Sequence, residues 1–167
     1  MFIMQNKLHL GCGENYLKGY HNIDKSRNLS QIDQRVDITI FLWPWASNGF
    51  VEILSDYVLC QIHDNETFVK ILNECWRVLD SGGIFKIKVP NAMYPQTVFR
   101  DPMDNRWFVK ESFDHFNYEH YRWQKLGQYD GFKPWKVIKV EEIAGQANPD
   151  LKDRLYVEMQ PYKEKAL

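Results

Sequence analysis

The chain has 167 residues, of which 44% are hydrophobic, and a formal net charge of −1, values typical of one folded domain rather than a general nucleic-acid binder. No apolar run reaches the roughly 20 residues of a membrane-spanning helix, and we expect neither a secretory leader nor a membrane partner. Its three cysteines have no metal-ligand spacing and no even disulfide count, so we expect no metal site and a cytoplasmic location.

A glycine-rich turn follows the first predicted strand. Residues 7–10 alternate in polarity and predict a short buried strand that ends at Gly11. Gly11 and Gly13 allow a sharp turn and leave no side chain to block a ligand at the strand tip. A second strand, predicted at 20–23, ends at the carboxylate of Asp24.

The turn and the acid together are typical of the nucleotide-binding corner of a Rossmann-like sheet, where an acidic residue can bind a ribose diol. The alternative is an ordinary tight turn, because Gly-x-Gly alone is a weak signal. A dinucleotide fingerprint places its acid about 20 residues further on, whereas Asp24 comes much sooner. The first crossover helix is therefore predicted to be short or missing, which argues against NAD.

Hydrophobic periodicity predicts the remaining elements. They are strands at 36–38, 50–57 and 84–89, helices at 66–79 and near 110–120, and two final strands at 135–143 and 154–160. We predict that Gly82 and Gly83 stop the first helix. Strands and crossovers alternate up to Val89, which predicts an α/β fold with a Rossmann-like, mostly parallel sheet. The last two strands are predicted to form an antiparallel far edge.

The chain is predicted to be a single domain, 1–167, in three parts. Residues 1–89 form the cofactor-binding half, 90–134 an aromatic-rich cover and acceptor segment, and 135–167 the sheet edge. The cover contains Trp107, Phe108, Phe113, Phe116, Tyr118, Tyr121, Trp123, Tyr129 and Phe132. These side chains can complete the core, wall an acceptor pocket or form a homodimer contact, and the pattern leaves all three open.

Five short motifs stand in the order found in one enzyme family. They are Leu8–Gly13, Gly19–Asp24, Val36–Ile38, Trp43–Trp45 and Arg77–Gly83. With them, the sequence resembles the class I S-adenosylmethionine-dependent methyltransferases, and more narrowly a compact branch of the type 11 methyltransferase-domain family. The resemblance extends to a segment at 101–113. A missing first helix is typical of that branch.

The resemblance implies S-adenosylmethionine as the cofactor and a set of residues that bind it. Asp24 would accept hydrogen bonds from the ribose hydroxyls, Asp37 would accept one from the adenine amino group, and the backbone of Ile38 would contact the ring. The glycine turn would border the methionine part. The full predicted set is Gly11, Cys12, Gly13, Asp24, Asp37, Ile38 and Tyr57. In the alternative reading, the two acids merely cap turns.

Candidate catalytic groups are few. Methyl transfer needs mainly alignment of the acceptor with an activated methyl group, and a base helps only for a hydroxyl or a protonated amine. Asp101 ranks first, because an Asp-Pro turn is expected to face the pocket, and His120 ranks second. The predicted function is methyl transfer to a small-molecule or glycan acceptor. Departures from the family after the fourth strand, at 57–61, leave a non-catalytic S-adenosylmethionine-binding or interaction module as the alternative.

Overall fold

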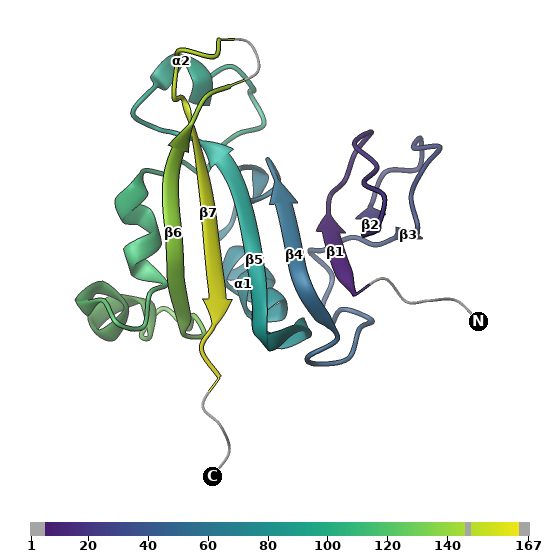
Figure 1. Cartoon of the computed structure of the whole chain (residues 1–167), viewed down its shortest axis with the longest axis horizontal. Coiled ribbons are helices and arrows are strands. Elements are labelled where there is room, and N and C mark those ends of the chain that lie inside the picture. Colours follow the sequence, from purple (N-terminus) through teal and green to yellow (C-terminus); the bar gives the residue numbers. More distant parts are fainter. Residues whose placement is uncertain (1–5, 146–147, 164–167) are drawn as a thin grey trace.

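A seven-stranded mixed sheet forms the centre of the computed structural model, which describes residues 6–145 and 148–163 (Figure 1). Its strands are β1 (Lys7–Leu10), β2 (His21–Asp24), β3 (Gln34–Arg35), β4 (Phe50–Asp56), β5 (Leu79–Pro90), β6 (Trp135–Ile143) and β7 (Arg154–Pro161). They are ordered β3-β2-β1-β4-β5-β7-β6, with β1 to β5 parallel and β7 antiparallel to both neighbours. The predicted Rossmann-like sheet with an antiparallel far edge is confirmed.

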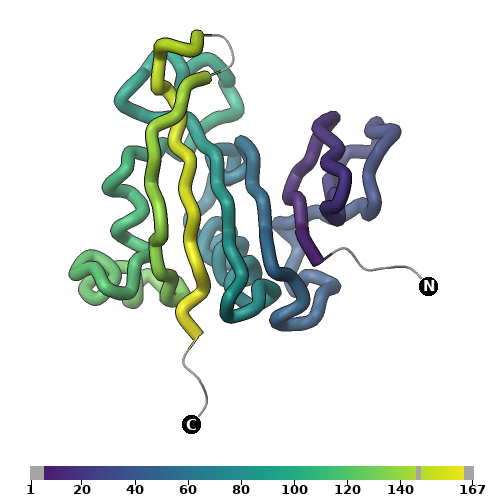
Figure 2. The backbone as a smooth tube through the Cα atoms, viewed as in Figure 1, coloured from purple at the N-terminus to yellow at the C-terminus, as the bar shows by residue number. Residues whose placement is uncertain are grey.

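Five helices of 3 to 14 residues connect the strands among the described residues. They are η1 (Leu59–Gln61), α1 (Asn65–Val78), α2 (Pro95–Val98), η2 (Lys110–His115) and η3 (Trp123–Gly127). Figures 1 and 2 show α1 behind the sheet, and among the described residues no helix lies in front of it. Residues 11–20 form turns rather than a helix, which confirms the missing first helix. None of the described helices combines the length and hydrophobicity needed to cross a bilayer.

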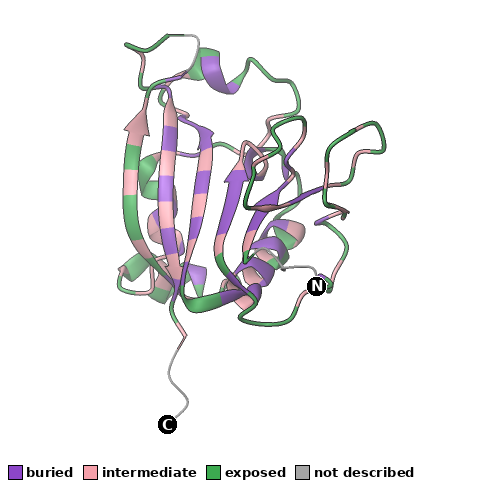
Figure 3. Cartoon of the chain, turned by 45° about the vertical axis from the view of Figure 1, so that its right-hand side comes forward, coloured by how far each residue is buried: buried purple, intermediate pink, exposed green. Residues whose placement is uncertain are grey.

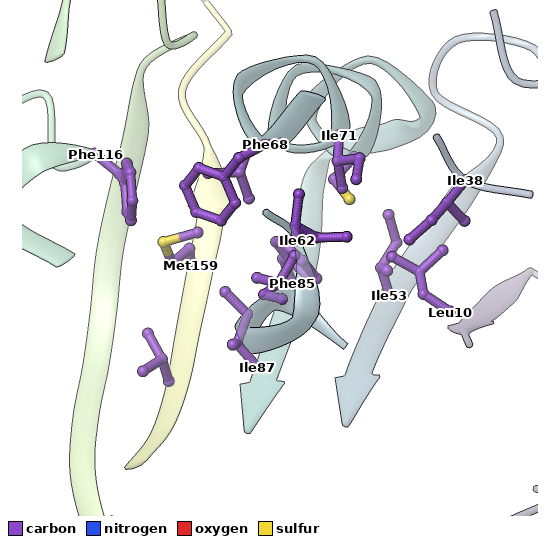
Figure 4. Packing of buried hydrophobic residues seen from close by; sticks show 14 of the residues in the cluster. Leu10, Ile38, Ile53, Ile62, Phe68, Ile71, Phe85, Ile87, Phe116 and Met159 are labelled. Carbon is purple, nitrogen blue, oxygen red and sulfur yellow. The ribbon is translucent and has the colours of Figure 1, made fainter. Parts of the chain in front are cut away.

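The hydrophobic core lies between the sheet and α1. Figure 4 shows Ile53, Phe85 and Ile87 pointing from the strands toward Phe68 and Ile71 of the helix. All five side chains are buried. Such burial contributes about 1.5–3 kcal/mol for each large apolar side chain, before the entropy of ordering the chain is counted.

The opposite face of the sheet is polar because no helix among the described residues covers it. Along β5, the partly exposed Lys86 and Lys88 alternate with buried residues. Figure 3 shows buried and intermediate residues alternating along the strands of the sheet. Lys86 pairs with Glu52 at 2.8 Å, and Lys88 pairs with Asp56 at 3.2 Å. Alternation of this kind is expected where one face of a sheet meets the core and the other meets water.

Helix α1 ends earlier than its glycines predict. Asp64 caps its start by accepting a hydrogen bond from the backbone of Thr67 at 2.9 Å, but strand β5 begins directly after Val78. The prediction that Gly82 and Gly83 stop the helix is wrong, because both lie inside β5. A Cβ atom on Gly83 would lie 2.8 Å from Leu79 Cδ2 and 3.1 Å from the carbonyl oxygen of Val51. Glycine there allows the two strands to approach closely where their register shifts.

Two other predicted elements are displaced. The third strand is Gln34–Arg35 rather than 36–38, because Ile23 and Asp24 of β2 pair with these two residues before the chain turns away. The helix predicted near 110–120 is only the 3₁₀ helix η2, and a turn separates it from η3. In this segment Phe113 and Phe116 pack into the core without forming the apolar face of a regular α-helix.

A buried carboxylate fastens the loop before β4 to the end of α1. Glu74 accepts hydrogen bonds from the backbone of Trp43 at 2.8 Å and from Arg77 Nε at 2.7 Å. Burial by itself raises the pKa of Glu74, but the hydrogen bonds from Arg77 and Trp43 and the charge of Arg77 together lower it below the usual value. The carboxylate therefore stabilises the fold in its ionised form.

This network makes stability depend on pH. A carboxyl group whose pKa is lower in the folded than in the unfolded state contributes stability above its unfolded pKa of about 4.3, and that contribution is lost as the pH falls through the folded pKa. We expect Glu74→Gln to lower the free energy of unfolding by about 1–3 kcal/mol near neutral pH. On acidification, the free energy of unfolding of the variant should fall less than that of the wild type.

Urea unfolding at about pH 7 and about pH 3.5 measures this difference. Glu66→Gln, which removes an exposed i,i+4 partner of Lys70, is the control and should change stability little. An identical pH dependence in Glu74→Gln and wild type would contradict this role of Glu74.

Candidate methyl-donor site

A cavity of 800 Å³ opens at the carboxyl edge of β1, β2 and β4. Because parallel strands end at the same edge, the turns that follow them meet there. The cavity is lined by Gly11, Cys12, Gly13, Asp24, Lys25, Val36, Asp37, Ile38, Thr39, Asp56, Tyr57, Val58, Gln61, Ile62, His63, Asp64, Thr67 and Met103. All seven residues predicted to bind the cofactor are therefore brought to one cavity, and their roles stay predictions.

The glycine turn has the open shape that a bound ligand requires. Gly11 and Gly13 have φ angles of +56° and +52°, a region that side chains disfavour. A Cβ atom on Gly11 would lie 2.7 Å from Val58 Cγ2. No atom lies within 4 Å of the corresponding position on Gly13, so a side chain there would occupy open space beside the cavity.

Asp24 joins the glycine turn to the loop after β2. One carboxylate oxygen accepts a hydrogen bond from the backbone of Gly13 at 3.0 Å, and the other accepts one from the backbone of Ser26 at 2.8 Å. A carboxylate oxygen has two lone pairs. Each oxygen of Asp24 therefore keeps an acceptor position for a ligand hydroxyl.

Asp37 and Ile38 present complementary groups on the next turn. Asp37 Oδ1 accepts hydrogen bonds from the backbone and hydroxyl of Thr39, at 3.0 and 2.7 Å, and Oδ2 has no partner among the described residues. Burial raises the pKa of Asp37, but Thr39 and the charge of Lys25 bring it below its usual value. The carbonyl of Ile38 accepts from Trp43 Nε1 at 3.0 Å. The Ile38 backbone N–H donates to no acceptor among the described residues, so it is available to a ligand.

Solved methyltransferases share this architecture. An S-adenosylmethionine-dependent methyltransferase from Archaeoglobus fulgidus matches with a TM-score of 0.62 and 11% identity, over 92% of this chain and 85% of that one. One from Clostridium acetobutylicum gives 0.60 and 12%, over 93% and 83%, and one from Mesorhizobium loti gives 0.57 and 16%, over 93% and 90%. This chain has the class I methyltransferase fold. Sequence comparison finds no matching family model and no matching curated protein, and the type 11 branch stays a prediction.

In this example of the methyltransferase fold, a side-chain network replaces the first helix. The buried Asn22 side chain accepts from the backbone of Leu17 at 2.9 Å and donates to the carbonyls of Leu17 and Tyr20. Its oxygen also lies 3.1 Å from Nδ1 of the buried His9, whose pKa burial lowers. Asn22 thus holds the loop that carries the glycine turn, a role that the strand pattern does not indicate.

Cys12 packs inside the turn of this methyltransferase fold rather than offering a nucleophile. Its side chain is buried, and burial together with the nearby charge of Asp24 raises the thiol pKa. A thiolate is the reactive form of cysteine. Cys12 therefore remains a protonated, closely packed thiol beside the cavity.

Tyr57 lies at the carboxyl end of β4 with its backbone in the left-handed region, at φ +58°. A residue other than glycine is strained there by roughly 1–2 kcal/mol. Its hydroxyl is buried without a hydrogen-bond partner among the described residues, and the guanidinium carbon of Arg154 lies 5.1 Å from the ring centre. Strained residues of this kind cluster at functional sites, and no sequence signal marked the strain.

The two predicted catalytic candidates do not line the cavity at the carboxyl edge of β1, β2 and β4. Asp101 is exposed, and its carboxylate accepts a hydrogen bond from the backbone of Met103 at 2.9 Å. His120 follows η2, with Nε2 3.7 Å from an oxygen of Asp114. Met103, which sequence reasoning missed, is the residue through which the cover reaches the cavity. The catalytic roles of Asp101 and His120 stay predictions.

Proposed function

We propose that the protein transfers a methyl group from S-adenosylmethionine to a small-molecule or glycan acceptor. One observation carries the proposal. In a methyltransferase fold, the glycine turn, Asp24 and Asp37 all line the same cavity. S-adenosylmethionine, when bound, supplies an activated methyl group on its sulfonium. The type 11 branch, a cytoplasmic location and a homodimer through the aromatic cover are finer parts of the same proposal.

Each residue of the cavity has a distinct part in this proposal. The open space at Gly13 admits the methionine portion, and the free lone pairs of Asp24 receive the ribose hydroxyls. Oδ2 of Asp37 accepts from the adenine amino group, while the Ile38 N–H donates to a ring nitrogen. Ribose and adenine are uncharged, and their hydroxyl, amino and ring-nitrogen groups can pair with these two carboxylates and this N–H.

The acceptor is proposed to enter beside Met103, where the cover meets the donor cavity. Two backbone N–H groups, those of Asn105 and Arg106, donate to the carbonyl of Cys60 at 3.0 Å and hold the cover there. Proximity and alignment can supply most of the acceleration when the methyl group is already activated. The protein needs a shaped and anchored wall more than a strong base.

Thermal unfolding with candidate ligands tests the donor assignment. A ligand present at about 100 times its dissociation constant stabilises the folded state by roughly 2.7 kcal/mol, which should raise the melting temperature by about 5–10 °C for a chain of this size. We expect S-adenosylmethionine and S-adenosylhomocysteine to produce this shift and NAD to produce none.

Two outcomes would reject parts of the proposal separately. The absence of a shift with either sulfur ligand at millimolar concentration would reject the donor assignment. A clear shift without formation of S-adenosylhomocysteine across an acceptor panel of sugars, phenols and amines would instead favour the non-catalytic binding module.

A further inference from the structure

A second cavity, of 640 Å³, lies between α1 and the segment that contains η2. Its volume falls within the range of small-molecule sites, about 300–1,000 Å³. Five of its fifteen lining residues are aromatic and form one part of its wall: Phe68, Trp107, Phe108, Phe116 and Phe132. Phe68 contacts Phe108, Phe116 and Phe132 with ring centres 6.0–6.2 Å apart. Such a wall favours a flat, apolar ligand.

One fixed cation lies against this aromatic wall. The guanidinium of Arg106 stacks over Phe68, with its carbon 4.0 Å from the ring centre. Nε donates to the carbonyl of Ile62 at 3.2 Å, and Nη2 donates to Asn65 Oδ1 at 3.0 Å. No carboxylate among the described residues lies within ion-pair distance of Arg106. Nη1 and a second N–H of Nη2 therefore remain for a ligand.

Among the described residues, no carboxylate that lines the cavity forms an ion pair with Arg106, and the charge of Asp64, which lines the other cavity, acts on the guanidinium from outside. Glu66 pairs with Lys70 at 2.6 Å, and Asp130 pairs with His115 at 2.8 Å. Glu111 and Arg122 also line the cavity, and both are exposed to solvent. A half-buried guanidinium whose N–H groups have no carboxylate partner can bind an anion through two hydrogen bonds in one plane.

We propose that this cavity binds a planar aromatic molecule that carries a carboxylate. The ring would lie among the phenylalanines, and the carboxylate would meet Arg106. The first turn of α1 separates this site from the donor cavity, because Asp64 and Thr67 line the donor cavity whereas Asn65 and Phe68 line this one. The proposal does not depend on methyl transfer.

Calorimetric titration with two matched probes tests the ligand class. 2-Naphthoate has the ring and the carboxylate, whereas 2-naphthamide has the same ring without the charge. We expect naphthoate to bind about tenfold more tightly, because a charge-assisted hydrogen bond is roughly twice as strong as a neutral one. Arg106→Gln should remove that preference, and Arg100→Gln, an exposed arginine of the same cover, should preserve it.

A filling variant tests the location. Val69 lines the cavity from α1, so Val69→Trp should abolish binding of both probes while keeping a cooperative thermal unfolding transition near the wild-type temperature. That transition reports whether each variant is folded, whatever the outcome for the donor cavity. Failure of naphthoate to bind at millimolar concentration, equal binding of the two probes, or displacement of naphthoate by S-adenosylhomocysteine would overturn the proposal.

Discussion

Removal of the Met103 side chain, by Met103→Ala, is expected to lower turnover by about 100-fold, since a displacement of about 1 Å at the reacting centre can have an effect of that size. Met103 is the residue of the cover that lines the donor cavity, and it is 57% exposed. Loss of this side chain leaves a gap in the wall against which the acceptor is aligned. The affinity for S-adenosylmethionine should change much less than turnover.

Met93→Ala is the matched control, because Met93 lies in the same cover, is 69% exposed and does not line the cavity. Turnover and donor affinity should be measured for both methionine variants with the same acceptor. Equal losses in the two variants would show that the cover acts only through general stability.

A general base would leave a different pattern. If Asp101 or His120 removes a proton from the acceptor, Asp101→Asn or His120→Gln should lower turnover by about 100- to 10,000-fold and change the pH profile. We expect smaller effects, because neither residue lines the cavity. A loss confined to one of these two variants, with Met103→Ala neutral, would show that the proximity mechanism is wrong.

Replacement of the two cavity acids should weaken donor binding without unfolding the chain. Asp24→Ala and Asp37→Ala each remove a hydrogen-bond acceptor, which typically costs about 1–3 kcal/mol and corresponds to a rise in dissociation constant of roughly 5- to 150-fold. Asp24→Ala should have the larger effect, because the same carboxylate holds the backbone N–H groups of Gly13 and Ser26. Calorimetry with S-adenosylhomocysteine gives both constants.

Asp80→Ala serves as the control for the two acids, because Asp80 is exposed on β5 and does not line the donor cavity. It should bind S-adenosylhomocysteine as the wild type does. Unchanged affinity in both Asp24→Ala and Asp37→Ala would mean that the adenosine portion binds elsewhere on the protein.

Local patterns in the sequence were enough to predict most of the sheet. Strand β6 lies at its predicted bounds, and β1, β4 and α1 lie within one residue of theirs. The alternation of Lys86 and Lys88 with buried residues marks a strand with one solvated face. These signals are local because the period of a strand or a helix depends on neighbouring residues and not on the partner that covers them.

By itself, the sequence determined the succession of strands along the chain, the glycine turn, the acid that ends β2 and the acid that follows β3. Each of these depends on residues close together in the chain, where apolar spacing and turn chemistry act directly. The tertiary structure alone decided that Asn22 replaces the first helix, that Tyr57 is strained, and that Met103 reaches the donor cavity. It also decided that Arg106 stacks on Phe68 without a carboxylate partner. The positions of Met103 and Arg106 join segments distant in sequence, and only packing against the sheet brings their side chains to the two cavities.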